Sequence, residues 1–495
     1  MIRKLAAGAL AGMLIFTSAC GGQTEEAAPT VPSQTTASPI TETEAPEETT
    51  EAREYPDLPE ADYGGFEFRV LSKDGSATYW TNRDIFAAEQ NGEPINDAVF
   101  LRNQTVGERY GVNITEDAGN SDPAAAARKT TLAGDDVYSM YAFSMPSYAA
   151  LATKGMLLDW HTLPNVDLSR PWYDQNSVES CSIGKKLYFA VGDILIMDKD
   201  ATWSTLFNKR LAADLGLPNL YELTINGGWT IDAMNTAMTD VAYDLDGDGK
   251  MGANDKWGLL GEAWNTNAFI AGAGVRVFSK DENDLPYISM NTERYYQVFE
   301  LASKINGDKS VTMLADNMSG FSDVWEECIR KAFREDRALF YVCSVFISAF
   351  LRMMESDFGI IPIPKYTESQ ERYYDIISLG AGDAMAVPIT VGDQERVGTI
   401  IEALSAESRY TLIPAYYDVT LYTKLARDEE STQMLDIIYS SRVYELGLLF
   451  GWGNLFYLPG DMTGKNSEAF ASSVEKKIKS AEKAMQKDID LFAAL

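Results

Sequence analysis

Histidine and cysteine, which build many catalytic and metal centres, are scarce in this sequence. The 495 residues include one His, His161, and four Cys. A single His argues against a His-dependent catalytic triad and against a metal site made of several His side chains. No two Cys form a Cys-x-x-Cys pair, so neither a zinc ribbon nor a thioredoxin-type redox centre is indicated.

Basic residues are also few. The chain has 42 Lys+Arg against 73 Asp+Glu, a formal charge of 42 − 73 = −31. Nucleic acids and anionic membrane surfaces repel such a protein and are poor partners for it. Strongly anionic ligands are disfavoured less, because an acidic protein can still contain a local basic pocket. With 45% hydrophobic residues the chain can bury a large core, and its length predicts two lobes or domains.

Long apolar runs are missing as well. No stretch approaches about 18 uninterrupted apolar residues, so no transmembrane helix is expected. The apolar run of residues 5–16 follows Arg3 and Lys4 and precedes Cys20, which is the order of a bacterial signal peptide. With residues 17–20 as a lipobox, the segment resembles a lipoprotein signal. The resemblance implies that residues 1–19 are removed and that Cys20 carries a diacylglyceryl group; an ordinary secretory signal is the alternative.

Residues 20–54 contain no aromatic side chain. After Cys20 the segment has eight Thr, eight Glu and four Pro, and nothing in it offsets the entropy that is lost on ordering. We expect a disordered tether that holds the following domain away from a membrane. Three Cys remain in the body of the chain, so at most one disulfide can form, and three buried thiols are the simpler expectation.

The body of the chain alternates strand-like and helix-like segments. Strands are predicted at residues 66–70, 112–114, 137–143 and 358–364, and a helix is predicted with Asn96 as its N-cap. Near the C-terminus, apolar residues spaced by three or four positions predict an amphipathic helix: Val474, Ile478, Ala481, Met485, Ile489 and Phe492. This alternation predicts an α/β class with mainly parallel sheets.

Seven short motifs occur in an order that resembles a known family. They are YGGFEF at 63–68, NGEPINDA at 91–98, PWYD at 171–174, LYFAVGD at 187–193, LFNK at 206–209, GWT at 228–230 and FGIIPIPK at 358–365. Together they are similar to the extracellular solute-binding lipoproteins of bacterial ABC importers, in the sugar-binding, maltose-binding-protein-like branch. The resemblance implies a two-lobe, periplasmic-binding-protein-like (type II) fold with discontinuous lobes, a hinge and a ligand cleft between the lobes.

The same resemblance predicts where the chain crosses between the lobes. A first crossing is expected near residue 195, a return in residues 338–344 and a third crossing in residues 383–388. Lobe I then comprises residues 55–195 plus 343–385, and lobe II comprises residues 196–342 plus 386–495.

One loop carries a pattern typical of calcium sites. Residues 244–255 place carboxylates at positions 1, 3, 5 and 12 and a Gly at position 6, as Ca²⁺ loops do. The predicted ligands are the carboxylates of Asp244, Asp246, Asp248 and Asp255 and the backbone carbonyl of Lys250. Position 12 is Asp where Glu is usual, and a solvated acidic turn is the alternative. We expect a structural ion, since the neighbouring carboxylates repel one another without it.

Aromatic and polar residues occur together in several loop-like segments. Sugar sites need aromatic faces for the ring C–H surfaces and carboxylates, amides or hydroxyls for the OH groups. The predicted ligand-binding residues are Trp80, Trp172, Tyr173, Asp174, Asp193, Trp203, Trp264, Ser344, Asp383 and Trp452. For each aromatic residue, a place in the core is the alternative.

The function predicted from these features is binding without catalysis. A monomeric receptor would capture a neutral sugar or oligosaccharide between its lobes and deliver it to an ABC permease. It would be anchored through Cys20 at the extracellular face of the cytoplasmic membrane. Two alternatives remain: a cell-wall-interacting lipoprotein and a secreted glycoside hydrolase, which needs two carboxylates placed across a sugar. No motif selects such a pair.

Overall fold

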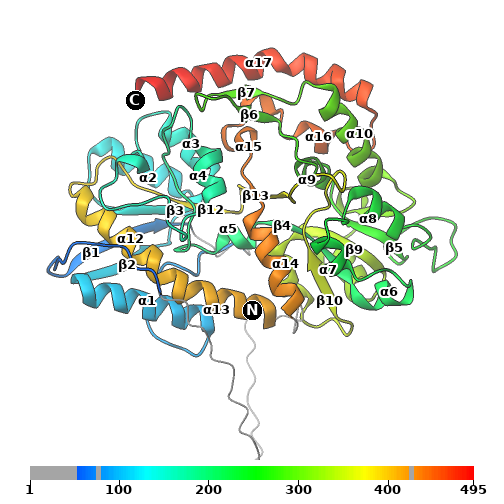
Figure 1. The fold of residues 1–495 in the computed structure, drawn as a ribbon, viewed down its shortest axis with the longest axis horizontal. Coiled ribbons are helices and arrows are strands. Elements are labelled where there is room, and N and C mark those ends of the chain that lie inside the picture. Colours follow the sequence, from blue (N-terminus) through cyan, green and yellow to red (C-terminus); the bar gives the residue numbers. More distant parts are fainter. Residues whose placement is uncertain (1–52, 74–79, 423–428) are drawn as a thin grey trace, which may run out of the picture. The chain divides into compact units, whose positions relative to one another are not determined.

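Two mixed sheets organise the folded part of the chain. The structure, a computed structural model, describes residues 53–73, 80–422 and 429–495. Arg53–Leu495 forms one compact unit, in which strands and helices alternate around the two sheets (Figure 1). The predicted α/β class is therefore confirmed.

The first sheet has the strand order β12-β3-β1-β2. β1 pairs in parallel with β2 and β3, and β12 is antiparallel to β3. This part of the chain comprises β1 (Phe66–Ser72), α1 (Pro94–Tyr110), β2 (Val112–Asp117), α2 (Pro123–Ala133), β3 (Met140–Ser144), α3 (Pro146–Ala152), η1 (Trp160–Thr162), α4 (Gln175–Cys181), β12 (Asp383–Ala386), α12 (Gln394–Tyr410) and α13 (Leu412–Tyr422).

Helix α1 begins two residues before the predicted N-cap. Glu93 is the N-cap, and its carboxylate accepts a hydrogen bond from the backbone N–H of Asn96 at 2.8 Å. Pro94 suits the first helical position because its missing N–H would have no partner there. Val99 and Val106 are buried on one face of the helix, as the apolar spacing requires.

The second sheet has the strand order β10-β4-β9-β5-β8. β5 is parallel to β8 and β9, whereas β4 is antiparallel to β9 and β10. The elements of this region are β4 (Trp203–Asn208), α6 (Lys209–Asp214), α7 (Leu220–Ile225), α8 (Ile231–Ala237), β5 (Trp257–Gly261), α9 (Asn265–Gly272), α10 (Glu293–Gly307), β8 (Thr312–Leu314), η2 (Ala315–Asn317), η3 (Trp325–Arg330), α11 (Lys331–Arg334), β9 (Ala338–Ser344), η4 (Val345–Leu351) and β10 (Phe358–Ile361).

Short segments join the two sheets. The chain enters the second sheet through α5 (Met197–Asp200) and returns to the first after β11 (Asp375–Ile376). β11 pairs with β13 (Arg442–Val443). α14 (Glu429–Ser440) then packs against β10, and a hairpin of β6 (Phe278–Lys280) and β7 (Pro286–Ile288) lies outside both sheets.

The sheets divide the chain differently from the predicted lobe ranges. β10 pairs with β4 and so belongs to the second sheet, although residues 343–385 were predicted for lobe I. Helix α12 packs on α1 beside the first sheet, although residues 386–495 were predicted for lobe II. The physical reason is that β9 is paired with both β4 and β5, so the return falls after β11 rather than at residues 338–344.

The C-terminal helix contacts both halves of the unit. It follows α15 (Leu446–Phe450), η5 (Trp452–Asn454) and α16 (Leu458–Asp461), and α17 spans Ser467–Ala494. At its start, Phe470 stacks on Phe299 of α10 with ring centroids 3.8 Å apart. At its end, Phe492 meets Tyr188 edge-on at 5.2 Å. The predicted amphipathic helix is confirmed, and α17 runs above both sheets (Figure 1, red).

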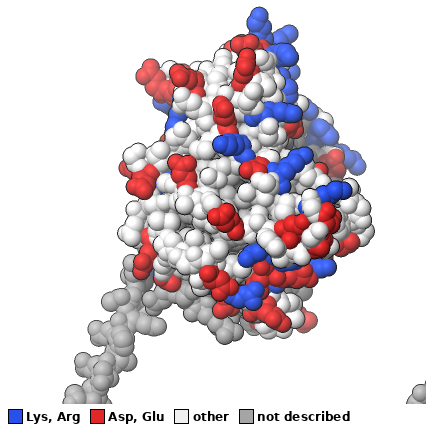
Figure 2. All heavy atoms as spheres, turned by 90° about the vertical axis from the view of Figure 1, so that its right-hand side faces the viewer, with Lys and Arg blue, Asp and Glu red and all other residues white. Residues whose placement is uncertain are grey.

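Three further expectations concern cysteine, membrane spans and charge. Cys181, Cys328 and Cys343 are buried free thiols, as expected. None of the helices in the described residues is long and apolar enough to cross a membrane. On the face seen in Figure 2, Lys and Arg side chains are most frequent toward the upper right edge, and acidic side chains lie both beside them and over the rest of the face.

Candidate functional site

A cavity of about 330 Å³ opens where the carboxyl ends of strands from the second sheet meet the segments that join the sheets. β5 ends immediately before Glu262, and β9 ends at Ser344. Crevices beyond the carboxyl ends of strands are the usual ligand sites of open α/β sheets. We name this the cleft cavity; its lining residues are Trp80, Trp203, Glu262, Asp323, Trp325, Arg330, Tyr341, Val342, Cys343, Ser344, Phe346, Ile347, Phe350, Ser378 and Ala381.

Aromatic rings form much of the cavity wall. Trp203, the first residue of β4, pairs in the ladder with Ser344 of β9, so the strand register fixes both side chains at the cavity. The Trp203 ring packs on Trp264 at 4.5 Å, and Trp80 packs on Phe346 at 5.0 Å. The indole Nε1–H of Trp203 is buried and has no hydrogen-bond partner among the described residues. A ligand oxygen could therefore accept from it without displacing an internal bond.

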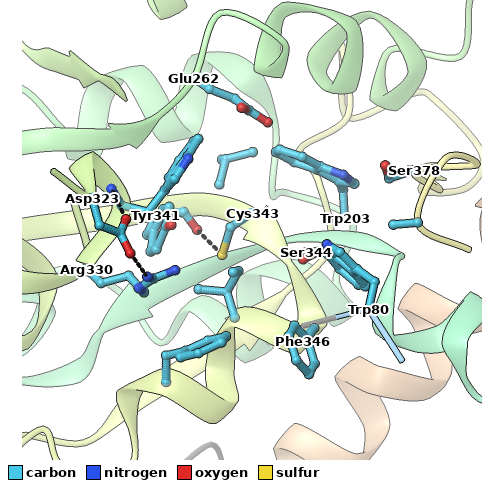
Figure 3. Close-up of a pocket in the computed structure, with 15 residues that line it drawn as sticks. Trp80, Trp203, Glu262, Asp323, Arg330, Tyr341, Cys343, Ser344, Phe346 and Ser378 are labelled. Carbon is cyan, nitrogen blue, oxygen red and sulfur yellow. Dashed lines mark hydrogen bonds and ion pairs between the residues drawn. The ribbon is translucent and has the colours of Figure 1, made fainter. Parts of the chain in front are cut away.

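The polar groups of the cavity come from several elements. Figure 3 shows Glu262 above the cavity, Asp323 and Arg330 on one side, and Trp203 with Ser378 on the other. Burial, with a smaller contribution from Asp316, raises the pKa of Glu262 to about 7. Its carboxyl group therefore carries only part of a charge near neutral pH.

Arg330 is the cation of the cleft cavity, and acidic residues neutralise it. Its Nε lies 2.9 Å from Glu326 and its Nη2 lies 3.6 Å from Asp323. The guanidinium also lies over the ring of Phe350, 4.6 Å from its centroid. A buried arginine that is held in this way contributes shape and hydrogen bonding more than net charge.

The structure brings three of the predicted ligand-binding residues to this cavity. Trp80, Trp203 and Ser344 line it. Trp264 supports Trp203 from behind and contacts Phe456 at 6.0 Å. Asp383 begins β12 and is held by Lys73 at 3.0 Å; burial raises its pKa to about 6, and it does not line the cavity.

A second group of predicted residues lies elsewhere. Trp172 and Tyr173 are buried, and both donate hydrogen bonds to Glu402, at 3.2 and 2.6 Å. Asp193 is paired with Lys199 at 3.4 Å and Arg409 at 3.3 Å.

Asp174 forms an ion pair with Arg442. Together with Tyr173 and Asp193 it lines a separate cavity of about 500 Å³.

Trp452 has internal partners. Its ring stacks on Phe450 at 4.7 Å, and its Nε1–H donates to Asp488 of α17 at 2.8 Å. It is buried and joins the C-terminal helix to the segment before it.

Several cavity residues were not predicted from the sequence. Glu262, Trp325, Arg330, Phe346 and Ser378 line the cavity without belonging to any of the motifs. The one available signal was for Glu262, because it directly follows an apolar strand-like run, where side chains reach the carboxyl end of a sheet.

The predicted calcium loop brings three of its carboxylates together. Oxygen atoms of Asp244, Asp246 and Asp255 lie within 4.8 Å of one another. Asp255 is 1% exposed, and its two oxygens accept from the N–H groups of Leu245 at 2.9 Å and Gly252 at 2.6 Å. Both Gly247 and Gly249 have positive φ angles, which the tight turn requires.

Asp248 and Lys250 are the other predicted calcium ligands, and Cys20 is the predicted lipidation site. The Asp248 carboxylate accepts from the N–H of Lys250 at 2.8 Å and lies outside the cluster of three. The donor set of hard oxygens suits Ca²⁺. Cys20 and the signal and tether residues up to 52 lie outside the described residues.

The two sheets and the segments that join them define the fold. It is the two-lobed, type II periplasmic-binding-protein fold of the maltose-binding type. No family model matches the sequence, and no curated protein matches it. The fold is nevertheless shared with solved structures that are only distantly similar in sequence.

Three of these structures show the likeness. A cyclo/maltodextrin-binding protein in complex with maltotetraose is 13% identical, with a TM-score of 0.53 over 88% of this chain and 98% of that one. The maltose/maltodextrin-binding domain MalE from Bdellovibrio bacteriovorus, bound to maltotriose, is 12% identical, with a TM-score of 0.51 over 85% and 100%. UspC from M. tuberculosis is 13% identical, with a TM-score of 0.54 over 83% and 100%. At these identities the likeness shows the fold.

Proposed function

We propose that this protein is a receptor that captures a neutral sugar or oligosaccharide in the cleft cavity. The observation that carries the proposal is the cavity wall: Trp80 and Trp203 line one cavity with Ser344 and Glu262 at the carboxyl ends of strands. Aromatic faces cover the C–H surfaces of a sugar ring, and the hydroxyl and carboxyl groups bind its OH groups.

The charge balance of the cavity favours a neutral ligand. Arg330 is compensated by Asp323 and Glu326, so it offers no free cation to an anionic sugar. Glu262, with its pKa near 7, accepts hydrogen bonds from hydroxyl groups when ionised. Two neighbours of the same fold were solved with maltotetraose and maltotriose, which supports a saccharide as the ligand class.

The cavity requires no chemistry of its own for this role. Ligand contacts with both sides would favour the closed arrangement of the two sheets, and that arrangement is what a membrane partner would recognise. The alternative is a glycoside hydrolase, because a carboxyl group with a pKa near 7 suits a general acid. Its second carboxylate would have to be Asp323, which is already held by Arg330.

Titration of tryptophan fluorescence with a panel of neutral mono- and oligosaccharides tests the proposal. We expect saturable binding of at least one saccharide and no release of reducing sugar over hours. Released reducing sugar would favour the hydrolase. Binding to intact cell-wall material together with no binding of any panel member would favour the wall-interacting lipoprotein.

We further propose that the receptor is anchored and works with an ABC permease. The signal-like residues 1–19, Cys20 and the Thr/Glu/Pro-rich segment support a lipid anchor at the extracellular face of the cytoplasmic membrane. In cells, the Cys20→Ala variant should leave the membrane fraction and fail to incorporate labelled palmitate. Equal membrane association of the variant and the wild type would contradict the anchor.

The loop of residues 244–255 is proposed to hold a structural Ca²⁺ ion. Its support is the convergence of Asp244, Asp246 and Asp255 with the glycine-dependent turn. Trp257, which starts β5, donates from its Nε1 to Gly252 O at 3.0 Å. Arg337 donates to Asp255 O at 3.0 Å. The loop is thereby tied to the amino end of β5, at the opposite end of the strand from Glu262 and the cleft cavity.

A further inference from the structure

A third cavity, of about 360 Å³, has a lining rich in cations although the protein is strongly acidic. It lies among α4, β6, β13 and the segment before β11. We name it the arginine cavity; its lining residues are Asn176, Glu179, Ser180, Arg276, Phe278, Ser279, Lys280, Arg372, Tyr374, Arg442, Val443, Tyr444 and Leu446. Four side chains in this lining are cationic and one, Glu179, is anionic.

Two of the four cations are compensated by the protein itself. Lys280 pairs with Asp284 and also donates to Ser182 Oγ at 2.9 Å. Arg442 pairs with Asp174 and Asp198. Even so, the Nε–H of Arg442 is buried and has no hydrogen-bond partner among the described residues, in a side chain that is 8% exposed.

The other two cations, Arg276 and Arg372, form no ion pair with any carboxylate of the described residues. Arg276 donates from Nη1 to the carbonyls of Ala271 and Val275, each at 3.0 Å. Arg372 donates from Nη2 to Ser440 O at 3.0 Å and to Asn176 Oδ1 at 3.4 Å. All of these hydrogen-bond acceptors are neutral, so neither arginine has a carboxylate in direct contact.

The two guanidinium groups are held close to one ring. Arg276 lies 4.7 Å and Arg372 lies 5.2 Å from the centroid of Tyr374. Burial lowers the pKa of Arg276, Glu445 and Tyr374 act in the opposite direction, and the charge of Arg372 lowers it further. Glu445 itself has its pKa raised to about 7 by burial, so it is a weak counter-charge. Like charges placed together without a partner create a field that an anion would relieve.

We infer that the arginine cavity binds a small oxyanion, carrying a phosphate or carboxylate group, between Arg276 and Arg372. Guanidinium groups present paired N–H donors that match the oxygens of either group. Arg442, whose Nε–H has no hydrogen-bond partner among the described residues, is a third guanidinium group in the same lining. The site is separate from the cleft cavity, because the two share no lining residue.

Calorimetric titration of the purified mature protein with inorganic phosphate, and in a second arm with citrate, tests this inference. The buffer should be Tris chloride, because sulfonate buffers would compete. We expect saturable binding of at least one probe, and the tighter of the two identifies the preferred group. Absence of saturation with both probes would overturn the inference.

Variants locate the binding. The double variant Arg276→Gln/Arg372→Gln should weaken anion binding by about tenfold or more, since charge-assisted bonds to both guanidinium groups are lost. The double Arg→Lys variant should bind with intermediate affinity, because it keeps the positive charge and loses the paired N–H donors of the guanidinium group. Arg128→Gln, an exposed arginine of α2, is the matched control and should bind as the wild type does.

Two further readouts separate the site from a folding defect and from sugar binding. The variants should keep the wild-type circular dichroism spectrum, and their affinity for the panel saccharide should not change. Equal loss of anion binding in Arg128→Gln, or unchanged binding in Arg276→Gln/Arg372→Gln, would overturn the inference. Failure of sugar binding in every protein would count against the proposed receptor and leave the anion result intact.

Discussion

The cleft cavity and the arginine cavity both contain arginine, but carboxylates balance its positive charge to different degrees. In the cleft cavity Arg330 has two acidic partners, whereas Arg276 and Arg372 in the arginine cavity have only neutral acceptors. The segment around β11 contributes Tyr374 to one cavity and Ser378 to the other. The pairing of arginine charges with carboxylates, and not the number of arginines, therefore decides whether a cavity suits a neutral or an anionic ligand.

The largest expected effect comes from removing the central ring of the cleft cavity. Trp203→Ala should weaken saccharide binding about 100-fold, or ~2.8 kcal/mol, because a buried aromatic anchor is lost. Phosphate binding at the arginine cavity should not change. Calorimetric titration with each ligand tests this prediction. Tyr287→Ala, at an exposed tyrosine of β7, is the control. Equal loss of both affinities would show that the two cavities are not independent.

The next effect concerns Asp375 in β11, the strand between the cavities. Burial raises its pKa to about 8, above its value of about 3.9 in an unfolded chain. The protonated carboxyl group makes its full contribution to the free energy of unfolding below about pH 4. This contribution falls by at most about 1.4 kcal/mol per pH unit as pH rises, and it is lost once the pH has risen through 8. Asp375→Asn should therefore flatten the fall in melting temperature between pH 5 and 8. A slope as steep as that of the wild type would contradict this assignment.

A smaller effect is expected from Glu262, the carboxyl group of the cleft cavity. Its pKa of about 7 means that it is increasingly ionised, and a stronger acceptor for sugar hydroxyls, as pH rises from 6 to 8. Saccharide affinity should rise over this range, and Glu262→Gln should lower affinity by about tenfold at pH 8. The variant should also lose the pH dependence. A pH dependence that persists in Glu262→Gln would assign it to another group.

The smallest effect should come from removing Ca²⁺, which leaves both cavities in place. The loop of residues 244–255 is bonded to the amino end of β5, away from Glu262. Chelation of the metal-replete protein should lower the melting temperature by about 2 °C and change neither the saccharide nor the phosphate affinity. Asp246→Asn should reproduce the shift. No shift on chelation would contradict the proposed structural Ca²⁺ ion.

The fold could be predicted from the sequence where the pattern was local. The strand at residues 66–70 and the C-terminal amphipathic helix follow from apolar spacing, and both are present. The lobe ranges depended on strand pairing, which links β10 to β4 across a long stretch of chain, and spacing holds no information about that partner.

The candidate site shows the same limit. Trp203 and Ser344 were predicted because they adjoin expected crossings, and the register of β4 and β9 brings them together. Trp172 and Trp452 match the composition of a sugar site equally well, but the carboxylates of Glu402 and Asp488 accept hydrogen bonds from their indole N–H groups. Arg276 and Arg372 are distant in sequence and lie near one Tyr ring only in the folded chain.

A crystal structure of the protein grown with the tightest-binding saccharide of the panel tests the central claim most directly. We predict that the sugar lies in the cleft cavity, with a ring face against Trp203 or Trp80 and a hydroxyl group bonded to Glu262. A saccharide found in the arginine cavity, or on the surface with the cleft cavity unchanged, would contradict the account.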